Sequence, residues 1–220
     1  MSSVDKNIRA SLEHIVVYPP SKREKYPTII ALHGRGADAS DLVPLVESLG
    51  RGDALVIAPR APLPFSLGGG FAWYDMGQDW TPHPVTFGKS LDLLRSFLVE
   101  VKAGYPVDPS RLVLLGFSQG TVMSYAAGLL EPSFVQGIVA LSGYVPLRSG
   151  LPLKLDGLKG LPVFISHGTY DDLIPVKFGR EASDLLRNAG AEVSFHEYLM
   201  GHEVNEETIM DLARWFKKLG

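Results

Sequence analysis

One serine stands where a hydroxyl could act as a nucleophile. Ser118 lies within GFSQG, residues 116–120, after the apolar run RLVLL and before TVMSYAAGLL, whose small side chains suit a closely packed helix. The pattern Gly-x-Ser-x-Gly is typical of a sharp strand-to-helix turn that exposes the serine hydroxyl. Larger side chains two residues to either side would clash across so tight a turn. In this context the pattern favours a nucleophile over an ordinary Gly-Ser turn.

A serine nucleophile needs a histidine base, and the histidines that follow Ser118 are His167, His196 and His202. His196 falls inside the alternating pattern SFHEY, which predicts a strand with this side chain on one sheet face. His202 falls in LMGHEVNEET, a predicted loop at the carboxyl end of that strand. Loops at that end face the crevice where α/β proteins bind ligands. We therefore predict that His202 is the base and that His196 is a partnered sheet residue.

The base needs an acid that orients its ring. The segment SHGTYDDLIP, residues 166–175, ends a predicted strand and carries Asp171 and Asp172 side by side. One of them could accept a hydrogen bond from the imidazole while the other stays in solvent. Spacing alone does not separate the two.

Alternating strand and helix patterns must position these residues. Short β-branched, apolar runs predict strands at 14–19, 28–34, 54–59, 111–117, 137–143, 162–168 and 193–199. Apolar residues at helical spacing predict helices at 87–101, 178–189 and 205–218. Asn205 is a suitable N-cap for the last helix, and Asp41 is expected to cap an earlier helix with Pro44 in its first turn. The sequence predicts one α/β domain over residues 1–220, with a mostly parallel central sheet flanked by helices.

Residues 60–84 fit neither pattern. The segment is long for a loop in a compact domain, and such loops are usually functional or disordered. Its aromatic residues, Phe65, Phe71, Trp73, Tyr74 and Trp80, favour an ordered loop that lines the active site.

Composition narrows the function classes. The chain of 220 residues is 45% hydrophobic and 20% charged, with a formal charge of -3 and no basic stripe, which argues against nucleic acid as a partner. Without cysteine, disulfides, thiolate catalysis and cysteine-ligated metals are excluded. The first residues lack the apolar core of a signal peptide, and no apolar run is long enough to span a membrane. We expect a cytoplasmic protein with a small-molecule partner.

Several motifs together resemble a known family. They are ALHGRGAD at 31–38, AWYDM at 72–76, GFSQG at 116–120, LSGYVP at 141–146, HGTYDDLIP at 167–175 and GHEV at 201–204. In this order they resemble the phospholipase/carboxylesterase family of small α/β-hydrolases, which includes acyl-protein thioesterases. The resemblance implies the α/β-hydrolase fold without a large cap domain, and it selects Asp171 as the acid. With segment 60–84 as a wall of the pocket, Trp73 is the best candidate for contact with the acyl or alcohol group, and core packing is the alternative. Gly34 and Tyr144 are the other predicted substrate contacts.

An oxyanion hole needs two N–H donors. Gln119 follows the nucleophile and supplies one. The strand ending at His33 and Gly34 places the second at Arg35, in agreement with the resemblance. An apolar residue commonly follows this His-Gly pair in the thioesterases, so the Arg35 side chain is a departure. We expect it either to bring a positive charge to the pocket rim or to pair with Asp38 or Asp41.

These expectations point to hydrolysis of carboxylic esters. The favoured function is a serine carboxylesterase that acts on short- to medium-chain esters through an acyl-enzyme intermediate. The alternative is an acyl-protein thioesterase or lysophospholipase acting on long acyl chains, and a non-catalytic binding module is a third hypothesis. The mechanism calls for no metal and no cofactor. Because members of the family often dimerise, the resemblance is compatible with a homodimer.

Overall fold

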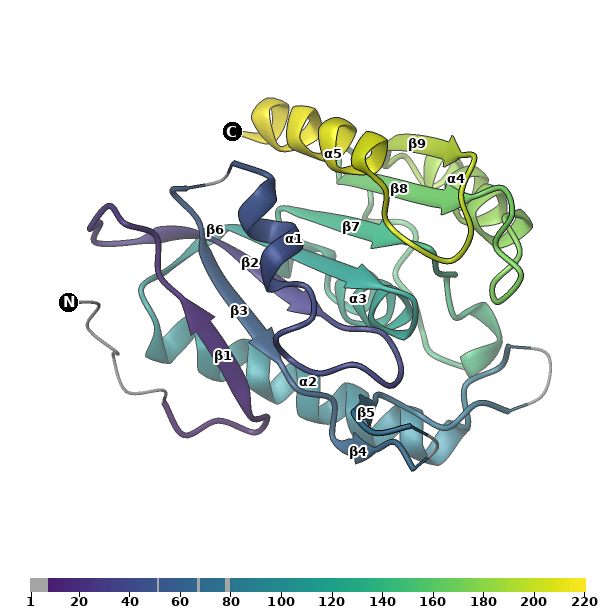
Figure 1. Ribbon diagram of the computed structural model, residues 1–220, viewed down its shortest axis with the longest axis horizontal. Helices are drawn as coiled ribbons and strands as arrows, with labels where there is room; N and C mark the ends of the chain where they lie inside the picture. Colours follow the sequence, from purple (N-terminus) through teal and green to yellow (C-terminus); the bar gives the residue numbers. More distant parts are fainter. Residues whose placement is uncertain (1–7, 51, 67, 78–79) are drawn as a thin grey trace.

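A seven-stranded sheet forms the centre of the computed structural model, which describes residues 8–50, 52–66, 68–77 and 80–220 (Figure 1). The strand order is β1-β3-β2-β6-β7-β8-β9, with β1 antiparallel to β3 and the other neighbours parallel. The bounds are β1 His14–Val17, β2 Tyr26–Leu32, β3 Leu55–Pro59, β6 Val107–Phe117, β7 Gly137–Leu141, β8 Pro162–Gly168 and β9 Glu192–Tyr198. Each predicted strand range contains most or all of one of these strands, apart from β6, which begins four residues earlier than expected.

Helices cover both faces of the sheet (Figure 1). Their bounds are α1 Val43–Ser48, α2 Pro84–Gly104, α3 Gln119–Leu130, α4 Lys177–Asn188 and α5 Glu206–Leu219, with short 3-10 turns η1 Pro132–Phe134 and η2 Leu147–Ser149. Buried side chains of α2, α3 and α4 pack against one face, and those of α1 and α5 against the other. This is the α/β-hydrolase arrangement with a single small domain.

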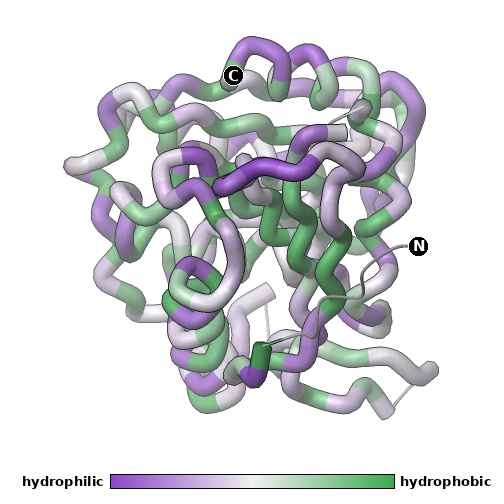
Figure 2. The backbone as a smooth tube through the Cα atoms, turned by 90° about the vertical axis from the view of Figure 1, so that its left-hand side faces the viewer, coloured by the Kyte–Doolittle hydropathy of each residue, from purple (hydrophilic) through white to green (hydrophobic). Residues whose placement is uncertain are grey.

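The continuously apolar strands are explained by this double cover. In β2, Ile30 and Leu32 point toward α2 and α3, whereas Ile29 and Ala31 point toward α1 and α5. Successive side chains of a strand point to opposite faces, so a strand covered twice needs apolar residues at every position. Figure 2 shows these hydrophobic strands running through the middle of the molecule.

Two predicted helix caps have different outcomes. At α5, the Asn205 side chain accepts a hydrogen bond of 2.9 Å from the Thr208 N–H, as expected. At α1 the expectation for Asp41 is wrong: the N-cap residue is Leu42, and no side chain caps the helix. Pro44 does lie in the first turn of α1, where its missing N–H costs nothing.

The aromatic segment 60–84 contains a two-stranded hairpin, β4 Leu63–Pro64 and β5 Phe71–Ala72. The hairpin is bonded to the loop after β2: the Gly36 N–H donates to Phe71 O, and the Phe71 N–H donates to Ala37 O, both at 2.8 Å. The described part of the chain carries no cap domain over the carboxyl edge of the sheet. Access to that edge is therefore shaped by loops.

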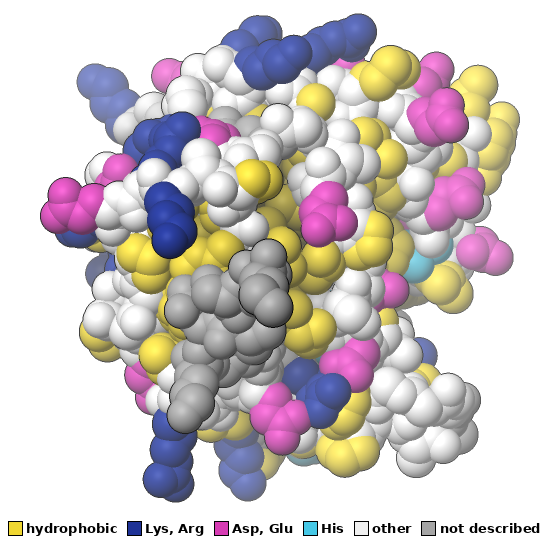
Figure 3. Space-filling model, turned by 60° about the vertical axis from the view of Figure 1, so that its left-hand side comes forward, with side chains coloured by type: hydrophobic (Ala, Val, Ile, Leu, Met, Phe, Trp, Pro, Cys, Tyr) yellow, Lys and Arg dark blue, Asp and Glu magenta, His cyan; other side chains and the backbone are white. Residues whose placement is uncertain are grey.

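The surface is mixed in charge. On the face drawn in Figure 3, acidic and basic side chains are scattered among apolar ones, without a stripe of one sign. Across the described ranges, no helix combines the length and the apolar character needed to cross a membrane.

Candidate active site

Ser118 lies at the sharp turn between β6 and α3. Its backbone has φ 55° and ψ -118°, a conformation that is costly for a residue with a side chain. The flanking glycines are required, because a Cβ on Gly116 would lie 2.3 Å from the Gly120 backbone and one on Gly120 would lie 1.8 Å from Leu32 O. The turn is anchored by the Ser118 N–H, which donates to Leu141 O at 2.9 Å. The geometry is that of the strained nucleophile turn that the sequence pattern predicts.

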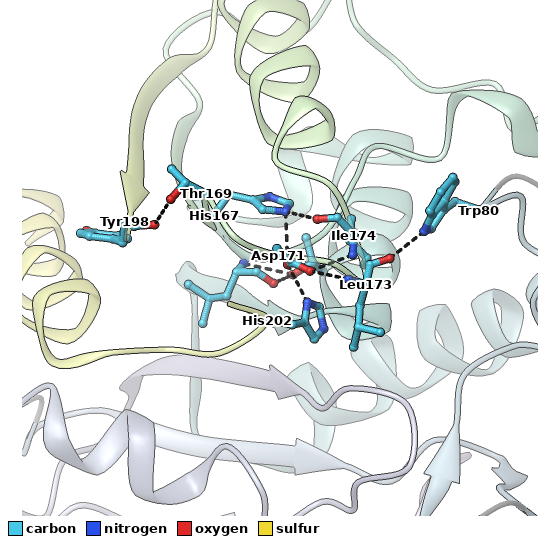
Figure 4. Close-up of polar contacts among 10 residues, drawn as sticks. Trp80, His167, Thr169, Asp171, Leu173, Ile174, Tyr198 and His202 are labelled. Carbon is cyan, nitrogen blue, oxygen red and sulfur yellow. Dashed lines mark hydrogen bonds and ion pairs between the residues drawn. The ribbon is translucent and has the colours of Figure 1, made fainter. Parts of the chain in front are cut away.

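Asp171 and His202 are brought together from loops 31 residues apart in the chain (Figure 4). The His202 Nδ1–H donates to Asp171 Oδ2 at 2.7 Å, and the other oxygen of Asp171 accepts from the N–H groups of Leu173 and Ile174 at 3.0 and 2.8 Å. The Asp171 side chain is fully buried and that of His202 is 12% exposed. Asp172, by contrast, is exposed. With Nδ1 protonated, the Nε2 of His202 is left as a base.

The backbone itself holds these two loops against each other. The Thr169 N–H donates to Tyr198 O at 2.8 Å, and the Tyr170 N–H donates to Met200 O at 3.0 Å. The backbones of the two loops approach so closely that a Cβ on Gly168 would lie 2.2 Å from Gly201 O. A glycine is therefore needed at the last position of β8 to let the acid reach the histidine.

His167 is a second histidine on the same carboxylate, and it was missed as a functional residue at the sequence level. Its Nε2–H donates to Ile174 O at 2.7 Å and lies 3.4 Å from Asp171 Oδ2 (Figure 4). Burial lowers the pKa of His167 below its ordinary value, so the ring is neutral. The signal that could have found it is a repeated dipeptide: His-Gly directly follows β2 as residues 33–34 and ends β8 as residues 167–168.

The two expected oxyanion donors both have an N–H group that is not used by the described part of the protein. Among the described residues, no carbonyl or side chain accepts from the N–H of Arg35 or that of Gln119. His33 fixes the orientation of the Arg35 N–H. Its Nδ1–H donates at 2.7 Å to Gly34 O, which belongs to the same peptide group as that N–H, while its Nε2 accepts from the Ala61 N–H at 3.0 Å. Burial lowers the pKa of His33, which keeps the ring in this neutral form.

The predicted substrate contact of Trp73 is wrong. The side chain has an exposed fraction of 0%, and its indole N–H donates to His33 O at 2.9 Å. The Trp73 N–H and Tyr74 O are bonded to the side-chain amide of Gln119 at 3.0 and 2.9 Å. Trp73 therefore packs in the core and ties segment 60–84 to the nucleophile turn, which was the alternative considered for it.

One cavity of about 490 Å³ joins the candidate residues. Ser118, Gln119, Arg35 and His202 line it, together with the predicted contacts Gly34 and Tyr144. The remaining lining residues are mostly apolar: Ala37, Asp41, Phe65, Tyr74, Met76, Trp80, Phe117, Leu173 and Ile174. The aromatic segment thus contributes to the cavity wall through Phe65, Tyr74, Met76 and Trp80 instead of Trp73.

Trp80 and Phe117 connect the cavity wall to the catalytic loops. The Trp80 indole N–H donates to Leu173 O at 2.9 Å, which links the aromatic segment to the loop that carries Asp171 (Figure 4). The Phe117 ring lies 4.9 Å from the His202 ring, centroid to centroid. A hydroxyl, an acid-oriented imidazole and two unused N–H groups around one apolar cavity are what acyl transfer requires.

His196, which was predicted to be a partnered sheet residue, does not line this cavity. His196 stacks on Phe164 with ring centroids 5.1 Å apart and pairs with Asp211 at 3.5 Å, as expected for a partnered sheet residue. In the ranges that the structure covers, no three His, Cys, Asp or Glu side chains are grouped as a metal site.

Comparison with known proteins gives consistent matches over nearly the whole chain. The sequence model of the family described as Phospholipase/Carboxylesterase matches residues 12–219. Acyl-protein thioesterase 1 of Yarrowia lipolytica is 31% identical over 219 residues, covering 90% of this chain and 94% of the relative. The Candida albicans protein of the same name is 30% identical, covering 87% of this chain and 91% of the relative. Among solved structures, the Bacillus cereus carboxylesterase superposes with a TM-score of 0.84 at 25% identity and covers 95% of both chains.

Proposed function

Because this chain belongs to the phospholipase/carboxylesterase family of α/β-hydrolases and is a serine hydrolase, we propose that Ser118, His202 and Asp171 hydrolyse carboxylic esters or thioesters. One observation supports the proposal above all: the buried Asp171 is hydrogen-bonded to His202, and His202 lines the same cavity as Ser118. Ser118 is held at a strained turn and lines the same cavity as Arg35 and Gln119, whose N–H groups have no acceptor among the described residues.

In the proposed mechanism, His202 Nε2 takes the proton of Ser118 as its Oγ attacks the acyl carbon. The N–H groups of Arg35 and Gln119 hold the oxyanion of the tetrahedral intermediate. His202 then gives its proton to the departing alcohol or thiol, which leaves an acyl-enzyme. Water attacks the acyl-enzyme with His202 again as base, releasing the carboxylic acid and restoring Ser118. Asp171 keeps the imidazole in one tautomer throughout.

The first candidate substrate class is a long-chain acyl thioester, which was the alternative at the sequence level. The curated relatives at 30% and 31% identity are named acyl-protein thioesterase 1, and they favour this class over short- to medium-chain esters. The apolar wall formed by Phe65, Met76, Trp80 and Leu173 supports it, because an acyl chain would leave water for that surface.

The second candidate is a carboxylesterase for short- to medium-chain esters. The observation that favours it is the charged side chain of Arg35 in the cavity, where the thioesterases commonly have an apolar residue. The likeness to the Bacillus cereus carboxylesterase is consistent with either candidate.

A chain-length series distinguishes the candidates. We would measure kcat/KM for p-nitrophenyl esters from acetyl to dodecanoyl, for S-acyl peptides of the same lengths and for a lysophospholipid, using the wild type and Ser118→Ala. Long-chain thioesters as the best substrates would support the first candidate, and short esters the second. In either case the activity should disappear in Ser118→Ala, and unchanged rates in that variant would refute the proposed function.

A further inference from the structure

Arg35 brings a positive charge into the candidate active site. Its side chain is exposed, and the residue lines the same cavity as Ser118 and His202. Because the N–H of the same residue is the proposed oxyanion donor, the guanidinium lies within one side-chain length of the scissile carbonyl. Any group that it binds therefore belongs to a part of the substrate close to the reacting bond.

Of the two alternatives expected for Arg35, pairing with Asp38 or Asp41 is not the one found. Asp38 is taken by Arg60, whose Nε and Nη2 donate to its two oxygens at 2.7 and 2.9 Å. This bidentate contact holds the pKa of Asp38 below its ordinary value, so the carboxylate stays charged and occupied. Within the described ranges Arg35 forms no ion pair, with Asp41 or with any other acid.

An aromatic ring holds the guanidinium in place. The Arg35 Cζ lies 5.1 Å from the centroid of the Phe65 ring, a cation–π distance that leaves the N–H edges of the guanidinium able to donate. The charge also acts on Tyr74: burial raises the pKa of this phenol well above its ordinary value, and Arg35 opposes that rise. The Tyr74 hydroxyl lies 3.3 Å from the Tyr144 hydroxyl, and both residues line the cavity with Arg35.

The cavity lining also includes one acid, Asp41. Asp41 borders the place where the cavity adjoins a groove between α1 and the start of α5, which Leu45, Val204 and Ile209 line with other residues. Arg35 instead stacks on segment 60–84. The cavity lining therefore contains one cationic and one anionic side chain, and among the described residues the two form no ion pair with each other.

We propose that Arg35 makes this enzyme selective for esters or thioesters that carry an anionic group, a carboxylate or a phosphate, a few bonds from the scissile carbonyl. The inference rests on the proposed hydrolysis at Ser118 and adds the charge of the substrate. A guanidinium binds both anions through paired N–H donors, and an apolar environment strengthens the contact relative to bulk water. A mostly apolar cavity thereby gains a preference for negatively charged substrates that its shape alone would not provide.

Two matched substrate pairs test the proposal. The carboxylate pair is monoethyl succinate and the ethyl ester of succinamic acid, which have the same length and differ in charge. The phosphate pair is butyryl glycerol phosphate and glycerol monobutyrate. The measured quantity is the ratio of kcat/KM between the anionic and the neutral member. We expect Arg35→Gln to lower this ratio about tenfold or more, which is the size of a charge-assisted hydrogen bond.

Further variants separate charge from shape. Arg35→Lys should keep part of the preference, and Arg35→Glu should reverse it. Arg95→Gln is the matched control, because Arg95 lies on α2, pairs with Glu131 and is outside the cavity. A ratio lowered for one pair only would identify that anion as the natural group.

A ratio that is the same in the wild type and in Arg35→Gln would overturn the inference, provided that Ser118→Ala is inactive. Activity that survives in Ser118→Ala would instead overturn the proposed function. The two failures are therefore distinguishable with the same set of variants.

Discussion

Asp171 and Asp172 are neighbours in the chain whose carboxylates have opposite surroundings. Asp171 is buried and accepts hydrogen bonds from His202, Leu173 and Ile174, whereas Asp172 is exposed. Burial with several donors keeps a carboxylate in one position, and this fixed position is what orients an imidazole. The resemblance to the family selects the same residue for a different reason, namely its place in a motif.

Replacement of each aspartate by asparagine tests this assignment. Asp171→Asn keeps the shape but no longer favours the tautomer of His202 with Nδ1 protonated, so kcat should fall by about 10⁴-fold. Asp172→Asn is the matched control and should leave kcat unchanged. The measurement is steady-state hydrolysis of the best ester from the chain-length series. A large loss in Asp172→Asn together with an active Asp171→Asn would show that the wrong aspartate had been chosen.

At the scale of the elements, the nucleophile turn depends on the close approach of the start of α3 to the end of β2. Gly120 lies in the first turn of α3 directly against the end of β2, where a Cβ would lie 1.8 Å from Leu32 O. The atom in the way is backbone, so no side-chain rotation relieves the clash. The Gln119 side chain adds a second link, from the same turn to the backbone of Trp73 and Tyr74.

We predict that Gly120→Ala displaces the turn and lowers both stability and activity. Overpacking of a buried site typically costs about 1–3 kcal/mol, and a misplaced nucleophile lowers kcat further. The matched control is Gly88→Ala in α2, where a Cβ meets nothing within 4 Å. That change should stabilise the helix by about 0.5–1 kcal/mol because alanine is the better helix former. Urea unfolding and ester hydrolysis measure the two effects, and equal behaviour of the two variants would contradict the prediction.

Across the whole molecule, two buried histidines link stability to pH. Burial lowers the pKa of His33 and of His167 below the ordinary 6.5, so the native state resists protonation more than the unfolded chain does. As the pH falls below about 6.5, the unfolded chain takes up protons that the native state does not, and the free energy of unfolding decreases. The stability contributed by the neutral rings is complete above that pH.

We expect the melting temperature to be higher at about pH 7.5 than at about pH 5.5, the two sides of the unfolded histidine pKa. His33→Gln and His167→Gln should each lower stability at neutral pH and reduce its dependence on pH. His83→Gln is the control, because His83 is exposed just before α2. Thermal unfolding followed by circular dichroism over this pH range provides the measurement. The same slope in all four proteins would mean that neither buried histidine is responsible.

The chain by itself determined the alternation of strands and helices, the turn at Ser118 and the loop position of His202. These features depend on side-chain periodicity and on the glycines at 116 and 120, and both are local properties that a sequence displays directly. The N-cap at Asn205 is local in the same way, whereas the predicted cap at Asp41 failed because the backbone of α1 begins one residue later than that cap would require.

Only the tertiary structure decided which side chains face the cavity. Trp73 is in the core because its indole N–H donates to His33 O, 40 residues away in the chain. Arg35 has no ion-pair partner among the described residues because Arg60, 22 residues from Asp38, occupies that carboxylate. Such partners are chosen by the packing of distant segments around a shared edge of the sheet. No pattern within a short window of sequence contains that information, since it is the fold that sets which groups compete for each hydrogen bond.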